Sequence, residues 1–99
     1  MSDNIMGTNE GTVEATLKQR GKVYGDYKDV VATRSYIMKV LSDHYSKVND
    51  QPMPADIQLM FSDVVLKLVR AASSPQYEDS WLDLCGYSKL IQEVLSENH

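Results

Sequence analysis

Two carboxylates near the end of the chain are spaced so that they could hold a metal ion together. Asp79 and Asp83 lie in the run DSWLDLCGY at residues 79–87, and on a helix this spacing puts them on adjacent turns of one face. Asp83 falls among apolar positions, where a carboxylate is costly unless it is paired, hydrogen-bonded or bound to a metal. Such a pair can share Mg²⁺, which prefers oxygen ligands and usually retains waters and substrate phosphates.

A simpler role for the same residues is to begin the helix. Ser80 and Asp83 match a capping box with Asp in place of the usual Glu, and Asp79 would favour the positive end of the helix. Capping explains Asp79 well, but it does not explain why Asp83 faces the apolar side. Both interpretations therefore stay open, and Asp83 is the more informative residue.

Three charged residues follow one edge of another apolar stripe. Asp63, Lys67 and Arg70 are spaced i, i+4, i+7, and an intrahelical ion pair of about 0.3–0.5 kcal/mol is the usual reason for such spacing. The alternative is a phosphate site, because Arg forks onto phosphate oxygens and Lys supplies a compact charge. In that case Asp63 is a third candidate metal ligand.

Arg34 lies in the middle of an apolar arc. Its side chain can extend along the surface to water, neutralise a buried acid such as Asp83, or contribute to the phosphate site. The structural roles are the commoner ones for an arginine in this position.

The elements that must position these residues are helices. Apolar residues recur with helical period, Asp26 is placed to cap a helix, and Pro52 and Pro54 interrupt the pattern. Gly21 and Gly25 predict a turn between them. The sequence predicts an all-α, compact bundle of about four helices at residues 12–20, 27–48, 55–72 and 80–97, in a single domain over residues 12–99, after a flexible leader at residues 1–11.

Composition narrows the classes of function. The chain has 99 residues, 42% of them hydrophobic and 24% charged, with a formal net charge of −4. Without a basic stripe, nucleic-acid binding is not expected. The one cysteine, Cys85, fits a reducing compartment, and there is neither a secretory signal nor an apolar run long enough for a membrane span. We therefore expect a cytoplasmic protein that does not enter the membrane. We also expect a homo-oligomer, because association buries more apolar surface in a short helical chain.

Three blocks carry a resemblance to a known group. They are Tyr24-Gly25-Asp26 following Arg20, the run KLVR at residues 67–70, and the run at residues 79–87. Over roughly residues 15–95 the chain resembles a family of small bacteriophage and prophage proteins. More distantly, its helical pattern is similar to the all-α nucleoside triphosphate pyrophosphohydrolases, the MazG-like and dimeric dUTPase-like group.

The resemblance implies a nucleotide as ligand. Proteins of that group cleave a nucleoside triphosphate to the monophosphate and pyrophosphate, with Mg²⁺ held by acidic pairs on two helices of an oligomeric bundle. Here Asp83 stands for the last acid of one pair, Ser80 stands where a Glu would be, and Asp79 offers a nearby carboxylate. The second acidic pair is absent from this sequence.

The leading hypothesis is a phage-type, MazG-like nucleotide-binding protein of the bacterial cytoplasm, with Mg²⁺-dependent pyrophosphohydrolase activity as its catalytic form. Its residues are Asp79 and Asp83 for catalysis, these two and Asp63 for the metal, Lys67, Arg70 and Arg34 for phosphates, and Tyr24, Gly25, Asp26 and Tyr87 for the pocket wall. The alternative is a non-enzymatic helical protein that binds and modulates a host protein, which the absent acidic pair favours.

Overall fold

The computed structural model describes the backbone of residues 2–98 and the side chains of residues 12–97. The chain forms four α-helices, which are α1 (Ser2–Tyr24), α2 (Tyr27–Asn49), α3 (Ala55–Ser73) and α4 (Glu78–Asn98). The described part of the chain contains no strand, so the prediction of an all-α fold with four helices is confirmed. The flexible leader predicted for residues 1–11 lies outside the residues whose side chains are described.

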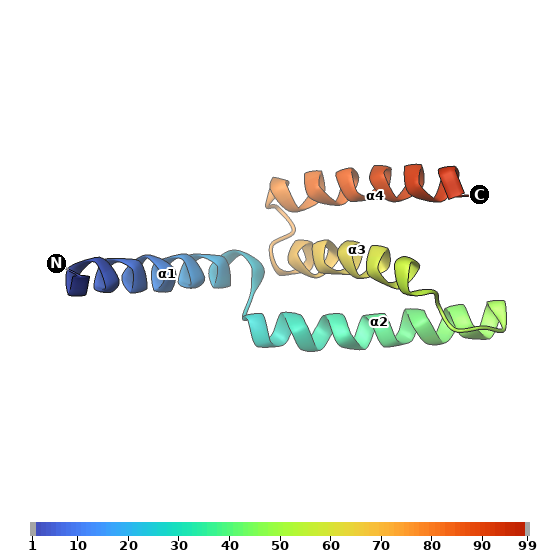
Figure 1. The fold of residues 1–99 in the computed structure, drawn as a ribbon, viewed down its shortest axis with the longest axis horizontal. Helices are drawn as coiled ribbons and strands as arrows, with labels where there is room; N and C mark the ends of the chain where they lie inside the picture. The colour runs from blue at the N-terminus through green and yellow to red at the C-terminus, as the bar shows by residue number, and fades with distance from the viewer. Residues whose placement is uncertain (1, 99) are drawn as a thin grey trace.

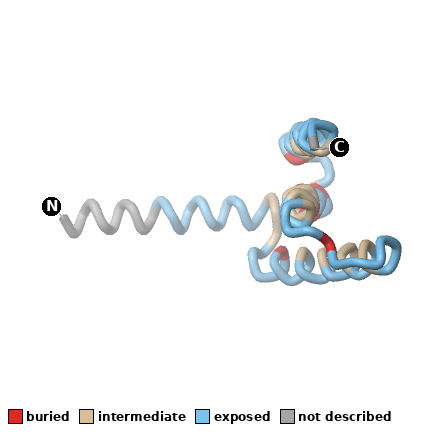
Figure 2. The backbone as a smooth tube through the Cα atoms, turned by 45° about the vertical axis from the view of Figure 1, so that its right-hand side comes forward, coloured by how far each residue is buried: buried red, intermediate tan, exposed pale blue. Residues whose placement is uncertain are grey.

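Helix α3 is the centre of the arrangement. It packs between α2 and α4 in a layer of three helices, and α1 extends beyond one end of that layer (Figure 1). The carboxyl end of α1 contacts α3 and α2, while α2 and α4 make no contact with each other within residues 2–98. The carboxyl ends of α1 and α3 therefore meet, in a region that Figure 2 views from another side.

Helix α1 is longer than predicted. It continues through Gly21 to Tyr24, so the turn predicted to begin at Gly21 is wrong. A glycine inside a helix costs only about 1 kcal/mol relative to alanine, which neighbouring contacts can offset. The helix ends instead at Gly25, whose φ of +87° lies in the left-handed region that favours glycine.

Local signals define the next two helices as expected. Asp26 is the N-cap of α2, and its carboxylate accepts a hydrogen bond of 3.1 Å from the backbone N–H of Lys28. The same helix ends at Asp50, which has a φ of 55° and donates its backbone N–H to the Ser46 carbonyl. Pro54 precedes α3, where its missing N–H is harmless.

Helix α4 begins two residues earlier than predicted. Ser80 therefore lies inside the first turn, is only 3% exposed, and its hydroxyl has no hydrogen-bond partner in the described part of the chain. The capping box considered for Ser80 and Asp83 does not form, because the Ser80 hydroxyl is buried in the first turn without a hydrogen-bond partner among the described residues.

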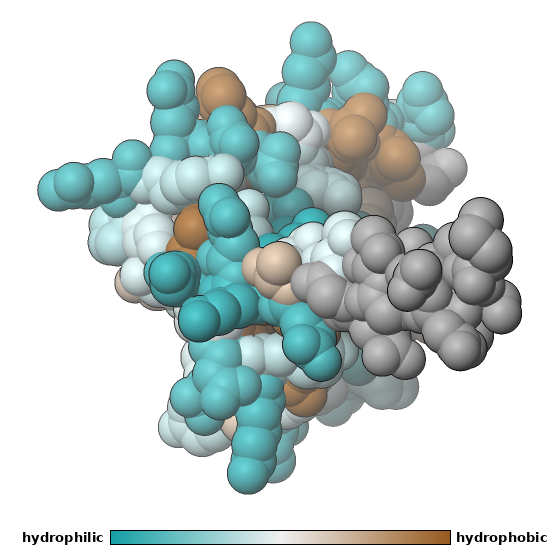
Figure 3. All heavy atoms as spheres, turned by 90° about the vertical axis from the view of Figure 1, so that its left-hand side faces the viewer, coloured by the Kyte–Doolittle hydropathy of each residue, from teal (hydrophilic) through white to brown (hydrophobic). Residues whose placement is uncertain are grey.

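The hydrophobic core is small and lies mainly between α2 and α3. Val30, Val65 and Val69 are buried there, with four partly buried residues packed around them: Ile37, Met38, Leu41 and Leu66. Many other apolar side chains are exposed, and Figure 3 shows hydrophobic groups reaching the surface at several places, including the top, where α4 lies. Among the described helices, none combines the length and hydropathy that a membrane crossing requires.

Candidate functional site

An ion pair between α3 and α4 explains the carboxylate on the packing face. Lys67 donates from Nζ to Asp83 Oδ2 at 2.9 Å, and the two side chains are 11% and 54% exposed. The same ammonium group lies 5.6 Å from the ring centroid of Tyr87. Asp83 therefore supplies the counter-charge that a nearly buried lysine needs. The intrahelical partner considered for Lys67 was Asp63, but its ion pair is with Asp83.

A second group of side chains joins three parts of the chain. Tyr24 ends α1, and the Arg70 guanidinium from α3 lies over its ring, 4.6 Å from the centroid. Tyr77, from the segment before α4, meets the same ring edge-on, with the centroids 5.9 Å apart at 88°. We call Arg70, Tyr24 and Tyr77 the aromatic corner. It combines a cation with aromatic surfaces, a pairing suited to anionic ligands that carry a ring.

Hydrogen bonds hold the segment that carries Tyr77. Ser74 donates its hydroxyl to the Val23 carbonyl, which ties the end of α3 to the end of α1. Trp81 donates its indole N–H to the Pro75 carbonyl at 2.7 Å. The first bond holds the start of this segment against α1, and the second joins it to the first turn of α4, so together they limit where Tyr77 can lie relative to Tyr24.

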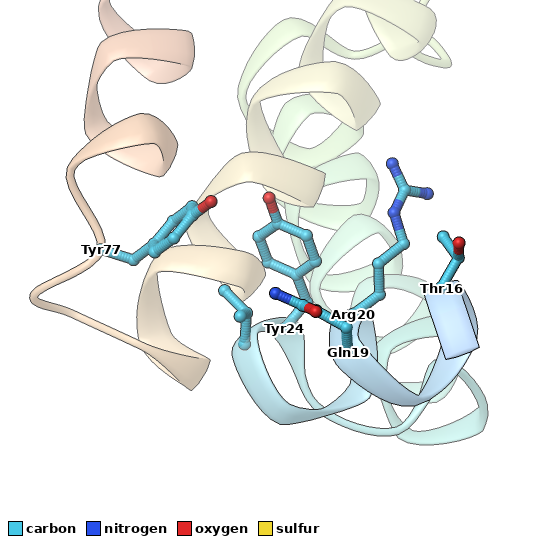
Figure 4. A pocket seen from close by; sticks show the side chains of 6 residues that line it. Thr16, Gln19, Arg20, Tyr24 and Tyr77 are labelled. Atoms are coloured by element: carbon cyan, nitrogen blue, oxygen red, sulfur yellow. The ribbon is translucent and has the colours of Figure 1, made fainter. Parts of the chain in front are cut away.

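A hollow of about 310 Å³ opens beside the aromatic corner (Figure 4). Its α1 residues recur with the spacing of one helix face, and the complete lining is Thr16, Gln19, Arg20, Val23, Tyr24 and Tyr77. Sequence reasoning missed Arg20 and Tyr77 as site residues. The signal for Arg20 was present, because it precedes Tyr24 by four residues, but the predicted turn at Gly21 separated the two.

The electrostatic setting of Tyr77 links the corner to Asp79. The pKa of the Tyr77 phenol is raised above its usual 10.0. The largest cause is the negative charge of Asp79, and the second is the neighbouring Tyr24. A tyrosine phenol is protonated at neutral pH even without this shift, so Tyr77 can donate a hydrogen bond there. Arg20 and Arg70, in contrast, have no acidic partner within 4.0 Å among the described side chains. Their positive charge remains available to an anion.

The residues predicted for the pocket wall separate into different roles. Tyr24 lines the hollow, whereas Asp26 caps α2 and Gly25 makes the turn between α1 and α2. A Cβ added at Gly25 would lie 3.2 Å from Ser73 Oγ, so this turn also lies close to the end of α3. Tyr87 lies on the Lys67 ammonium, one part of the α3–α4 contact.

Arg34 is engaged elsewhere. It donates from Nη2 to Ser62 Oγ at 3.1 Å between α2 and α3, and its Nε is buried without a partner among the described groups. Of the cations considered for Asp83, the structure thus selects Lys67 and leaves Arg34 on the other side of α3.

The carboxylates do not form a large cluster. Over the described side chains, no group of three or more Asp, Glu, His or Cys residues could hold a metal ion, so Asp63, Asp79 and Asp83 do not form such a set. Asp79 and Asp83 remain one turn apart on α4. Two carboxylates fit an ion that brings further oxygen ligands with it, such as Mg²⁺ on a triphosphate.

Comparison with known proteins identifies the family. The family model of DUF6378, a domain of unknown function, matches residues 9–95. No curated protein and no solved structure matches the chain. The matched span includes the hollow, the aromatic corner and the Lys67–Asp83 pair. On this match, the chain belongs to the DUF6378 family.

Proposed function

We propose that this chain is a MazG-like nucleotide-binding protein that takes a nucleoside triphosphate at the aromatic corner. The observation that carries the proposal is the Arg70 guanidinium lying 4.6 Å from the Tyr24 ring centroid, beside a hollow lined by Arg20 and Tyr77. A triphosphate needs cationic groups for its oxygens, and a base needs an aromatic surface. Both are present within one region.

In this proposal the phosphate groups of the nucleotide bind first to the arginines of the site, because these have no carboxylate partner in the described part of the chain. Lys67 is nearly buried and is already neutralised by Asp83, so a phosphate would have to compete with that carboxylate. Arg70 and Arg20 have no such competitor among the described side chains. In this proposal Arg70 and Arg20 bind phosphate oxygens, and the protonated Tyr77 phenol adds a hydrogen-bond donor.

The catalytic form of the proposal is pyrophosphate release. Water attacks the α-phosphorus, the bond to the α,β-bridging oxygen breaks, and pyrophosphate leaves with that oxygen while the nucleoside monophosphate remains. Asp79 and Asp83 would hold the Mg²⁺ that the triphosphate carries, and the ion would supply charge neutralisation during the cleavage. At Asp83 the ion would compete with the Lys67 ammonium, which already donates a hydrogen bond to that carboxylate.

The test of binding is thermal unfolding with and without nucleotide. A ligand at about 100 times its Kd stabilises the native state by about 2.7 kcal/mol, which raises Tm by several degrees in a chain of this size. We expect Mg²⁺ with one of the common (d)NTPs to raise Tm, and Arg70→Ala to abolish the rise. Lys39→Ala is the matched control, because Lys39 is an exposed residue of α2 whose ion pair among the described side chains is with Asp43. No Tm shift with any (d)NTP would refute binding.

Pyrophosphate assays test the catalytic form separately. We expect release from the nucleotide that gives the Tm shift, dependent on Mg²⁺ and lost in Asp79→Asn. A Tm shift without pyrophosphate release would leave binding standing and remove the hydrolase activity.

A second candidate function is a non-enzymatic protein that binds and modulates a host protein. The exposed apolar side chains favour it, since Trp81 and Leu82 at the start of α4 are 44% and 60% exposed. Large exposed apolar groups are typical of interaction sites. A stoichiometric host partner retained by Asp83→Ala, together with the absence of any nucleotide-induced Tm shift, would favour this function.

A further inference from the structure

A second hollow, of about 340 Å³, lies where one flank of α2 meets α3. It shares no residue with the hollow beside the aromatic corner. Among the described residues that line it, Arg34 alone carries a charge, three others carry a hydroxyl group, and two are apolar. The complete lining is Tyr27, Val31, Arg34, Ser35, Met38 and Ser62. A volume near the lower end of the range for ligand sites suits a small molecule.

The Arg34 guanidinium has no counter-charge from the described side chains. Arg34 is partly buried, and no described carboxylate lies within 4.0 Å of its nitrogens. Its Nη2 donates to Ser62 Oγ at 3.1 Å, while its Nε is buried without a partner among the same residues. A cation partly withdrawn from water costs free energy unless an anion offsets it. An anion in this hollow would therefore meet a charge that the fold has already partly desolvated.

The rest of the lining indicates which kind of anion fits. Ser62 accepts from Arg34, so its own O–H remains available as a donor, and Val31 and Met38 form an apolar wall. A phosphate monoester carries nearly two negative charges at neutral pH, which one arginine does not balance. A carboxylate carries a single charge, and arginine forks onto its two oxygens. The hollow therefore favours a carboxylate that is attached to an apolar body.

We propose that this hollow binds a small organic acid, with the carboxylate on Arg34 and the apolar body against Val31 and Met38. Arg34 donates from the N–H groups that Ser62 does not use, and the Ser62 hydroxyl supplies a further donor. A ligand of the size of benzoate should bind with a Kd of about 1 mM, which is typical for few atoms and one charge-assisted contact. This site is separate from the aromatic corner and does not depend on the proposed function.

An NMR titration with benzoate, at constant ionic strength and without nucleotide, tests the proposal. We expect saturating shifts of the backbone amides around Arg34 and Ser62. Benzyl alcohol has the same ring without the charge and should bind about tenfold more weakly or worse, because the charge-assisted hydrogen bonds are lost. Inorganic phosphate, which lacks an apolar body, should also bind more weakly than benzoate. Arg70→Met should leave these shifts unchanged, since Arg70 does not line this hollow.

A carboxylate built into the hollow should replace the ligand. Val31 is 39% exposed and precedes Arg34 by three residues on α2, so Val31→Glu places a carboxylate on the same face of the helix. We expect this variant to weaken benzoate binding by about tenfold or more. Val40→Glu is the matched control, because Val40 is a 49% exposed valine of α2 that does not line the hollow. It should keep the wild-type Kd.

Arg34→Met removes the cation directly and should abolish the benzoate shifts. Val31→Glu keeps the test decisive if Arg34→Met fails to fold, and circular dichroism checks the helix content of both. The proposal is overturned by shifts that do not saturate or that occur only at the aromatic corner. Benzyl alcohol or phosphate binding as tightly as benzoate would also overturn it, as would an unchanged Kd in a folded Val31→Glu.

Discussion

Arg70 places its guanidinium carbon 4.6 Å from the ring centroid of Tyr24, although 46 residues separate the two in the chain. The contact joins α1 to α3 at the point where the hollow opens. It gives the end of α1 a defined position, and it supplies the cation and ring on which the proposed nucleotide site depends.

Two substitutions of Tyr24 should distinguish what its ring contributes to stability from what its hydroxyl group contributes. We expect Tyr24→Leu to lower the free energy of unfolding by about 1 kcal/mol, because the cation–π contact with Arg70 is lost. Tyr24→Phe keeps the ring and should change stability by less than half as much. Urea unfolding followed by circular dichroism measures both variants. Equal losses would mean that the ring contact contributes nothing.

Removal of Asp83 should destabilise the α3–α4 contact. Asp83→Ala leaves the Lys67 ammonium nearly buried without its carboxylate, and we expect a loss of about 1–2 kcal/mol, reduced by the half-exposure of Asp83. Adding Lys67→Met should restore most of that loss, since the unpaired charge is then gone.

The exposed ion pair of Lys39 and Asp43 provides the control for these variants of Asp83 and Lys67. Its side chains are 74% and 67% exposed, so water screens the pair and Asp43→Ala should cost much less stability than Asp83→Ala. A double variant of Lys67 and Asp83 no more stable than Asp83→Ala alone would contradict the assigned ion pair.

The two glycines at the end of α1 should respond to alanine with opposite signs. Gly25→Ala should destabilise the chain by about 1–2 kcal/mol, because alanine is strained at positive φ and its Cβ would lie 3.2 Å from Ser73 Oγ. Gly21→Ala should stabilise it by about 0.5–1 kcal/mol, because Gly21 is inside the helix and nothing lies within 4 Å of an added Cβ. Thermal melts of the two variants give the comparison, and a shared sign would contradict the observed end of α1.

The Tyr77 phenol should titrate at a higher pH than an isolated tyrosine. The carboxylate of Asp79 opposes the phenolate and raises the pKa of Tyr77 above 10.0. Because the folded pKa exceeds the unfolded one, the stabilising contribution is complete below about pH 10 and is lost as pH rises through the folded pKa. Difference absorbance between wild type and Tyr77→Phe isolates this titration.

Asp79→Asn tests the cause of that shift. It removes the negative charge while retaining the size of the side chain, so the pKa of Tyr77 should fall toward 10.0. An unchanged titration in this variant would show that Asp79 does not act on the phenol.

The sequence predicts the middle of the fold better than its ends. Helices α2 and α3 end within one residue of the predicted limits, because Asp26, Pro54 and the proline-rich break act locally. Gly21 misled the prediction for α1, since a glycine can lie inside a helix when tertiary contacts stabilise it. Ser80 misled the prediction for the start of α4, because the burial of this serine is an effect of tertiary packing that local sequence does not show.

The candidate site was accessible from the sequence only in part. An acid on an apolar face predicted that Asp83 has a partner, but three cations were available and only the fold selects Lys67. The aromatic corner was not predicted, because Tyr77 lies in a segment without periodicity and approaches Tyr24 only through the path of the chain between α3 and α4.

Helix α3 touches all three other helices, whereas α4 touches only α3 within the described chain. Detachment of α4 therefore breaks only the contacts between α3 and α4, but detachment of α3 breaks nearly all contacts between helices. Amide hydrogens of α3 should exchange with solvent only through global unfolding, while those of α4 should exchange through a lower-energy, local detachment. Each such detachment separates Asp83 from Lys67, so the protein can transiently expose both charges without unfolding its α2–α3 core.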